Sequence, residues 1–285
     1  MAKSKVYTRQ TFISLFNSIA RHKHRYSVFT DFVFMSAIAF HNAICKNEAL
    51  EKEYLEIVGK YSKAEVNSFC ELLGNFIVLM DAEPRDILGS LYMELELGNT
   101  NNGQFFTPHE ISLLMAKIVY GDVLEGMKDS SKPFITVSEP ACGAGGMVLA
   151  FANEMRKQKV NPAEKMFVQC TDIDRVAGFM CYLQLSLWHI PAQVIIGNTL
   201  TMEWREIYYT PAYYLGQWET RLRVRRFMEI FESTPEPKEN EPAQKQTQSE
   251  PAAVESKTNI KTHKTKTQPS TIGFQGDLFD FQIDH

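Results

Sequence analysis

Apolar side chains recur every three or four residues through the first hundred positions, which is the spacing of amphipathic helices. Residues 11–16, 29–44 and 66–80 follow this spacing most clearly. The last of these carries Phe69, Leu72, Leu73, Phe76 and Leu79 on one helical face. The pattern therefore predicts a small bundle of helices over residues 1–98.

From about residue 103 to 210 the pattern changes to short apolar runs separated by helical stretches. The runs predict strands at 133–138, 167–171, 193–197 and 205–209. Strands that alternate with helices are typical of an α/β fold with a parallel sheet. By analogy with doubly wound folds, we expect the strand order 3-2-1-4.

A last amphipathic helix is predicted at 217–232, where Arg221, Arg223, Arg225 and Arg226 alternate with apolar side chains. We expect Trp218, Leu222, Phe227, Met228 and Phe231 to face the core and the arginines to face solvent. Binding of the arginine face to DNA is the alternative.

Composition changes again after residue 232. Residues 233–270 are dominated by Pro, Glu, Lys, Gln and Thr and predict a disordered linker. Residues 271–285 regain apolar side chains, as in a short docking peptide. The expected organisation is thus a helical domain at 1–98, an α/β domain at 99–232, the linker and the peptide.

Charge and cysteine spacing narrow the classes of function. A net charge of −4 with a pI near 6.0 argues against a protein that coats nucleic acid generally. The basic run at 21–25 could meet phosphates, but a solvated loop between helices is favoured. Five cysteines show no paired ligand spacing, so we expect neither a metal site nor disulfides. Without a bilayer-length apolar run or a cleavable signal, a cytoplasmic location is expected.

The most informative stretch is the glycine-rich segment at 139–146, E-P-A-C-G-A-G-G, which follows the first predicted strand. Gly143, Gly145 and Gly146 allow a sharp turn and a close approach of the backbone to a ligand. The acid Glu139 beside the turn argues against a phosphate and favours a cationic or polyhydroxylated ligand. Asp172, at the end of the next strand, has the position of an acid that binds ribose.

Four segments, at 103–108, 139–146, 168–174 and 194–200, resemble those of the S-adenosylmethionine-dependent DNA adenine-N6 methyltransferases. The closest resemblance is to the modification subunits of type I restriction systems. It implies a Rossmann-like methyltransferase sheet, apparently truncated, because the family's full sheet has seven strands. It also implies S-adenosylmethionine as the cofactor and DNA as the partner. The cofactor-binding residues that it implies are Phe105, Thr107, Pro108, Glu139, Pro140, Ala141, Gly143, Gly145, Asp172, Ile173 and Asn198.

The resemblance also implies individual roles. Thr107 would contact the methionine carboxylate, Asp172 the ribose hydroxyls and Asn198 the adenine amine. Ile173 would lie against the adenine ring.

The catalytic motif departs from the family pattern, because no Pro-Pro pair occurs in the chain. In place of N-P-P-[FY], the segment after the fourth predicted strand carries Thr210, Pro211 and Tyr213, which are the candidate catalytic residues. Loss of the amide typically costs about 3 to 4 kcal/mol of transition-state stabilisation. A plain turn is an equally open interpretation of this segment.

Two functions follow from the resemblance. One is an enzyme that methylates adenine N6 in DNA. The other is an inactive cofactor-binding module that acts as an accessory or antagonist in a restriction-modification or replication-linked complex. The open edge of the sheet must be covered, either by the helix at 217–232, by the N-terminal bundle, or by a partner such as a second subunit or a homo-oligomer.

The terminal peptide resembles the motif with which bacterial replication and repair proteins bind the sliding clamp. Gln275, Asp277, Leu278 and Phe279 carry that resemblance. The alternative is that the peptide folds back onto its own domain.

Overall fold

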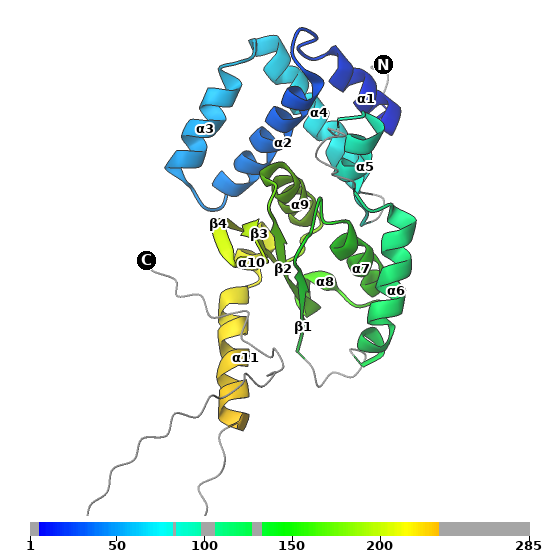
Figure 1. The fold of residues 1–285 in the computed structure, drawn as a ribbon, viewed down its shortest axis with the longest axis vertical. Coiled ribbons are helices and arrows are strands. Elements are labelled where there is room, and N and C mark those ends of the chain that lie inside the picture. The colour runs from blue at the N-terminus through cyan, green and yellow to red at the C-terminus, as the bar shows by residue number, and fades with distance from the viewer. Residues whose placement is uncertain (1–5, 82–83, 98–105, 127–132, 234–285) are drawn as a thin grey trace, which may run out of the picture. The chain divides into compact units, whose positions relative to one another are not determined.

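A computed structural model describes residues 6–81, 84–97, 106–126 and 133–233, with side chains omitted for 119–126 (Figure 1). These ranges contain a helical N-terminal part and a mixed α/β part, so the predicted fold class is confirmed. The terminal peptide and linker lie outside the described residues. The helices are α1 (Arg9–Ser18), α2 (Arg25–Asn42), α3 (Glu48–Val58), α4 (Lys63–Met80), α5 (Ile87–Glu94), α6 (His109–Gly126), α7 (Gly146–Lys157), α8 (Pro162–Lys165), α9 (Arg175–Leu187), α10 (Pro211–Leu215) and α11 (Trp218–Ser233). The strands are β1 (Ile135–Glu139), β2 (Met166–Asp172), β3 (Ala192–Asn198) and β4 (Glu203–Tyr209).

Local capping explains where the N-terminal helices begin. Thr8 and Ser62 form capping boxes with the third residues of α1 and α4, which satisfies backbone N–H groups at each start. The basic run at 21–25 forms the connection between α1 and α2. Arg25 donates to the carbonyls of Phe16 and Ile19 at 3.2 and 2.8 Å, and so closes the end of α1. This contact favours the loop interpretation of the basic run.

The four strands lie in the order β1-β2-β3-β4. The adjacency of the first three strands agrees with the prediction, and both pairs are parallel. The fourth strand was predicted wrongly: β4 pairs antiparallel with β3 instead of lying beside β1. Only residues 199–202 connect β3 to β4, whereas a parallel crossover needs about a dozen residues or more. The short connection therefore forces a hairpin.

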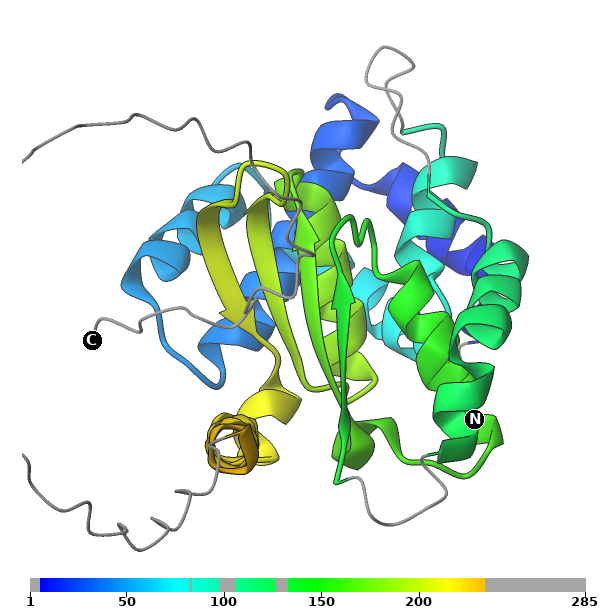
Figure 2. The same cartoon turned by 60° about the horizontal axis from the view of Figure 1, so that its bottom comes forward.

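One face of the sheet is covered by α9, and α2 lies against the other side of that helix (Figure 2). The close approach of α9 to the sheet depends on Gly178, where an added Cβ would lie 2.1 Å from Cδ1 of Ile196. Phe34 of α2 meets Phe179 of α9 edge to face, with ring centroids 4.9 Å apart.

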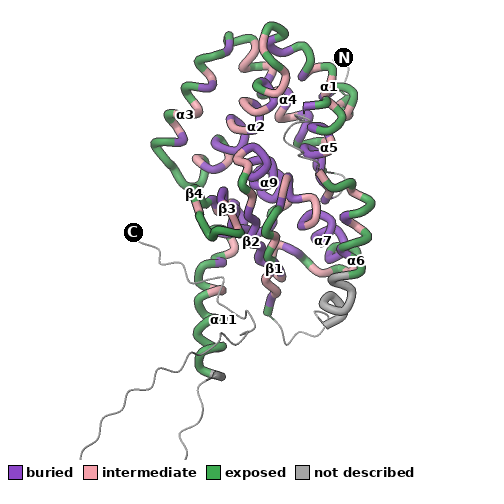
Figure 3. Tube along the Cα trace, viewed as in Figure 1, coloured by how far each residue is buried: buried purple, intermediate pink, exposed green. Residues whose placement is uncertain are grey.

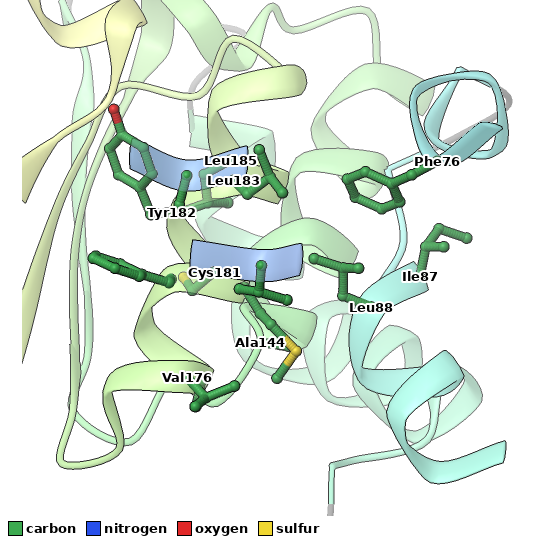
Figure 4. Close-up of a cluster of buried hydrophobic side chains, with 14 of the residues drawn as sticks. Phe76, Ile87, Leu88, Ala144, Val176, Cys181, Tyr182, Leu183 and Leu185 are labelled. Carbon is green, nitrogen blue, oxygen red and sulfur yellow. The ribbon is translucent and has the colours of Figure 1, made fainter. Parts of the chain in front are cut away.

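Helix α5 completes this core: Ile87 and Leu88 extend toward the side chains of α9 (Figure 4). One hydrophobic cluster thus connects the N-terminal helices with the sheet. The boundary at 98/99 stays a prediction.

Helix α11 differs from the prediction in which side chains it buries. Trp218 is fully buried and its ring lies 5.0 Å from that of Phe134. Phe227, Met228 and Phe231, which were expected in the core, are 66%, 55% and 72% exposed, as is much of the later part of the helix (Figure 3). The reason is that the described contacts of α11 with the sheet are made by its first turns.

Two arginines of α11 pair with acids of their own helix, whereas Arg221, which was expected to face solvent, lies 3.8 Å from the ring centroid of Trp218. Arg223 pairs with Glu219 and Arg225 with Glu229, at 2.8 and 2.7 Å. Among the described helices, none combines the length and apolar character needed to cross a bilayer.

Candidate nucleoside-binding site

The glycine-rich segment forms the turn between β1 and α7. Gly143 and Gly145 have φ values of 54° and 89°, in the left-handed region that side chains rarely occupy. A Cβ on Gly145 would also lie 3.0 Å from Sγ of Cys181. Both glycines are therefore required by the backbone itself, and the turn presents bare backbone at the start of a helix.

The parallel register places the ends of β1, β2 and β3 at one edge of the sheet. Glu139 is level with Cys170, and Asp172 is level with Ile196, so each strand extends two residues beyond its neighbour. The polar side chains of Glu139, Asp172 and Asn198 consequently end at the same edge. We expected these three residues at one site, and the register places them at the same end of three neighbouring strands.

Asp172 fastens the glycine turn to β2. Its Oδ2 accepts a hydrogen bond from the backbone N–H of Gly143 at 2.8 Å, and its Oδ1 accepts one from Asp174 at 2.9 Å. The N–H of Cys142 donates to the Thr171 carbonyl at 2.9 Å. The acid that the sequence suggested for ligand binding thus also shapes the turn.

The turn after β3 closes the other side of the site. The hydroxyl of Thr199 donates to the Pro140 carbonyl at 2.7 Å. The carboxamide oxygen of Asn198 accepts from the Leu200 N–H at 2.9 Å, which is the usual role of Asn in a turn. Ile173 is 62% exposed beside this turn, as an apolar side chain that could lie against a base would be.

The upstream segment reaches the same turn through an aromatic side chain. A Cβ on Gly143 would lie 3.2 Å from the ring of Phe106, which meets Tyr92 edge to face at 5.3 Å. Phe105, the predicted aromatic, lies outside the described residues. Thr107 and Pro108 follow Phe106 and are exposed at the start of α6. Phe106 was not among the predicted cofactor-binding residues, although it directly follows Phe105 in the sequence.

A buried polar network lies behind the turn and was missed altogether. Gln184 of α9 donates to the Ala144 carbonyl at 2.7 Å and to Oδ1 of Asp86 at 2.9 Å. Its side-chain oxygen accepts from the first two N–H groups of α5, those of Ile87 and Leu88. Because Asp86 and Gln184 are far apart in the chain, no local pattern could have indicated their pairing.

The electrostatics of the site disfavour an anionic ligand. Burial raises the pKa of Glu139, and the neighbouring Cys170 and Asp172 raise it further. Burial likewise raises the pKa of Asp172, against the lowering effect of its backbone hydrogen bonds. Two partly buried acids side by side are stabilised by a nearby cation and destabilised by a phosphate.

The predicted catalytic segment is not part of this site, and its expected proximity to the cofactor residues is wrong. Because β4 runs antiparallel, Thr210 lies level with Ala192 at the start of β3. Because β3 is seven residues long, the two ends of the strands lie about 20 Å apart. Thr210 is fully buried and donates to the Ile190 carbonyl at 2.7 Å. Pro211 begins α10, and Tyr213 stacks on Tyr209 with ring centroids 4.3 Å apart.

A cavity of about 570 Å³ also lies away from the glycine turn. Its lining includes Arg156 and Val160 near the end of α7, and Trp188 and Ile190 before β3. It is therefore at the opposite end of the strands from Glu139 and Asp172.

The fold and the strand ends described above define an α/β protein in which two partly buried acids lie beside a left-handed glycine turn. Residues 83–240 match the N-6 DNA methylase family, and the chain belongs to that family. Membership of this family is consistent with S-adenosylmethionine as the cofactor.

One solved structure is similar, a protein of Listeria monocytogenes described as a class I S-adenosylmethionine-dependent methyltransferase. The identity is 17% and the TM-score 0.31, over 57% of this chain and 51% of that one. This chain thus spans about half of that protein. No curated protein sequence matches the chain.

Proposed function

We propose that the edge formed by Glu139, Asp172 and Asn198 binds S-adenosylmethionine, and that the protein methylates adenine N6 in DNA. The observation that carries the proposal is the convergence of three distant segments on the glycine turn. Phe106, Asp172 and Thr199 each contact the turn. The donor supplies a methyl group on a positively charged sulfur.

The residues present suit this donor. Gly143 and Gly145 let the backbone approach it closely, and a side chain at either position would fill the cradle or strain the turn. Asp172 would accept hydrogen bonds from the ribose hydroxyls through lone pairs that its backbone contacts leave free. Glu139 and Asp172 would stabilise the positive charge of the donor. The exposed Ile173 would cover one face of the adenine.

Calorimetric titration with S-adenosylmethionine tests the binding step. Replacing Asp172 by Ala removes hydrogen bonds to a charged group worth about 1.5 to 3 kcal/mol, so affinity should fall roughly 10- to 150-fold. The matched control is Glu164→Gln, which changes an acid of α8, before the start of β2. Equal affinity in wild type and Asp172→Ala would refute the proposed site.

Incubation with radiolabelled donor and unmethylated DNA, followed by mass spectrometry of the nucleosides, tests the reaction. Label in N6-methyladenine is the expected product. Label in a cytosine would contradict the adenine assignment, and its absence would contradict the enzyme.

A specific observation favours a second candidate, a cofactor-binding module without transferase activity. The nearest candidate for the family's catalytic motif, at Thr210 to Tyr213, lies at the opposite end of the strands from the glycine turn. A protein that binds the donor tightly but transfers no label would fit this candidate. A partner chain, or a second copy beside β1, would then supply the groups that hold the target base.

A further inference from the structure

Three cysteine thiols converge directly behind the glycine turn. Cys142 lies in the turn, Cys170 in β2 and Cys181 in α9. Their sulfur atoms all lie within 4.8 Å of one another. The residues are 6%, 0% and 0% exposed. Their spacing along the chain gave no hint of this cluster, which only the fold assembles.

The cluster is joined mechanically to the candidate site. The backbone N–H of Cys142 donates to the Thr171 carbonyl, one residue after Cys170. The left-handed Gly145 approaches Cys181 so closely that a Cβ there would lie 3.0 Å from its sulfur. Anything that ties the three sulfurs together therefore ties the turn to both β2 and α9.

The geometry suits a metal ion better than a disulfide. A disulfide would use two of the thiols and leave the third unpaired, whereas a trigonal ion uses all three equally. Metal–sulfur bonds of about 2.3 Å place coordinated sulfurs about 4 Å apart, so the thiols need to move by less than about 1 Å. Within the described residues, no imidazole or carboxylate belongs to the group, so the donor set is sulfur alone.

A donor set of three sulfurs selects soft cations over Mg²⁺, Ca²⁺ and Mn²⁺, which prefer oxygen. Zinc usually takes a fourth ligand, which a nearly inaccessible cluster does not offer. Monovalent copper accepts thiolates readily and is the softer of the two ions. We propose that Cys142, Cys170 and Cys181 form a three-thiolate site for a soft cation of the Cu(I) type.

Binding would displace the thiol protons and fix the glycine turn from behind. The consequence for S-adenosylmethionine rests on the proposed function: a turn already held by the ion should bind the donor more tightly. The metal site itself does not depend on that function, and it is tested without the donor.

The test is an anaerobic titration of the reduced full-length protein with Cu(I) against a chromogenic Cu(I) chelator. One equivalent should be retained, with charge-transfer absorption in the near ultraviolet and three sulfur neighbours by X-ray absorption. Alanine replacement of Cys142 or of Cys181 should weaken retention at least about 100-fold. The matched controls are Cys45→Ala and Cys70→Ala, which change the two exposed cysteines and should leave retention unchanged.

A second measurement on the wild-type protein avoids variants that fold poorly. Alkylation followed by mass spectrometry should label Cys45 and Cys70 but spare the other three thiols, and urea should expose those three only in the metal-free protein. The proposal would be overturned if no Cu(I) were retained or if Cys181→Ala retained as much as wild type. It would also be overturned if urea exposed the three thiols equally with and without the metal. Loss of two thiols to a disulfide in the anaerobic, metal-free protein would overturn it as well.

Discussion

Replacing Gln184 by Met should destabilise the protein far more than a buried glutamine usually would. The substitution keeps the size of the side chain but removes all of its hydrogen bonds. Gln184 is fully buried, so water cannot replace them. The N–H groups of Ile87 and Leu88 and the carbonyl of Ala144 would be left without this partner. Each buried group left unsatisfied costs about 1 to 3 kcal/mol, and after partial relaxation we expect a total of about 3 to 5 kcal/mol.

Gln169→Met is the matched control, because Gln169 is a second buried glutamine of the same core. It donates one hydrogen bond, to Gln193 at 3.0 Å, and its own oxygen has no hydrogen-bond partner. Its replacement leaves one buried acceptor, the Gln193 oxygen, without its donor and should therefore cost about 1 to 2 kcal/mol. Urea denaturation followed by circular dichroism measures both variants. If Gln184→Met cost no more than Gln169→Met, the network behind the glycine turn would not carry the stability assigned to it.

Three further predictions concern other parts of the chain. Burial raises the pKa of Asp86 in the folded protein. The contribution of Asp86 to stability is therefore fully present below its unfolded pKa of about 4, and it is lost as the pH rises through its folded pKa. Urea titrations at several pH values should show this slope in wild type and a flatter one in Asp86→Asn. Thr210→Val removes the hydroxyl that accepts from the Ala192 N–H and donates to the Ile190 carbonyl. The free energy of unfolding should fall by about 2 to 3 kcal/mol, while the affinity for S-adenosylmethionine measured by calorimetry should not change. Deleting residues 271–285 should abolish binding to a bacterial sliding clamp in surface plasmon resonance, and unchanged binding would remove that partner.

The local pattern predicted most of the elements and much of the candidate site. Each observed strand begins and ends within about two residues of its predicted range. The reason is that an apolar run bounded by turn residues is a local signal that extends over only a few positions. The glycine turn and the acid after β2 were visible for the same reason. In a parallel sheet, successive strand ends reach one edge, so Glu139, Asp172 and Asn198 were expected together and are found together.

The direction of β4 illustrates what a pattern cannot supply. Its residues predicted a strand, but analogy placed it beside β1 with Thr210 near the cofactor residues. The short connection after Asn198 instead turned it back along β3 and carried Thr210 to the opposite edge. The aromatic side chains of α11 show the same limit, since amphipathic spacing identifies a face without showing what covers it.

The sequence by itself determined the order of helices and strands, the left-handed glycine turn and the acids that end β1 and β2. Only the tertiary structure decided that Gln184 holds that turn from behind, and that Cys142, Cys170 and Cys181 meet. The physical reason is one of range. Backbone propensity and hydrophobic periodicity act over a few residues, whereas these contacts join segments about ten to a hundred residues apart and exist only once the core has packed.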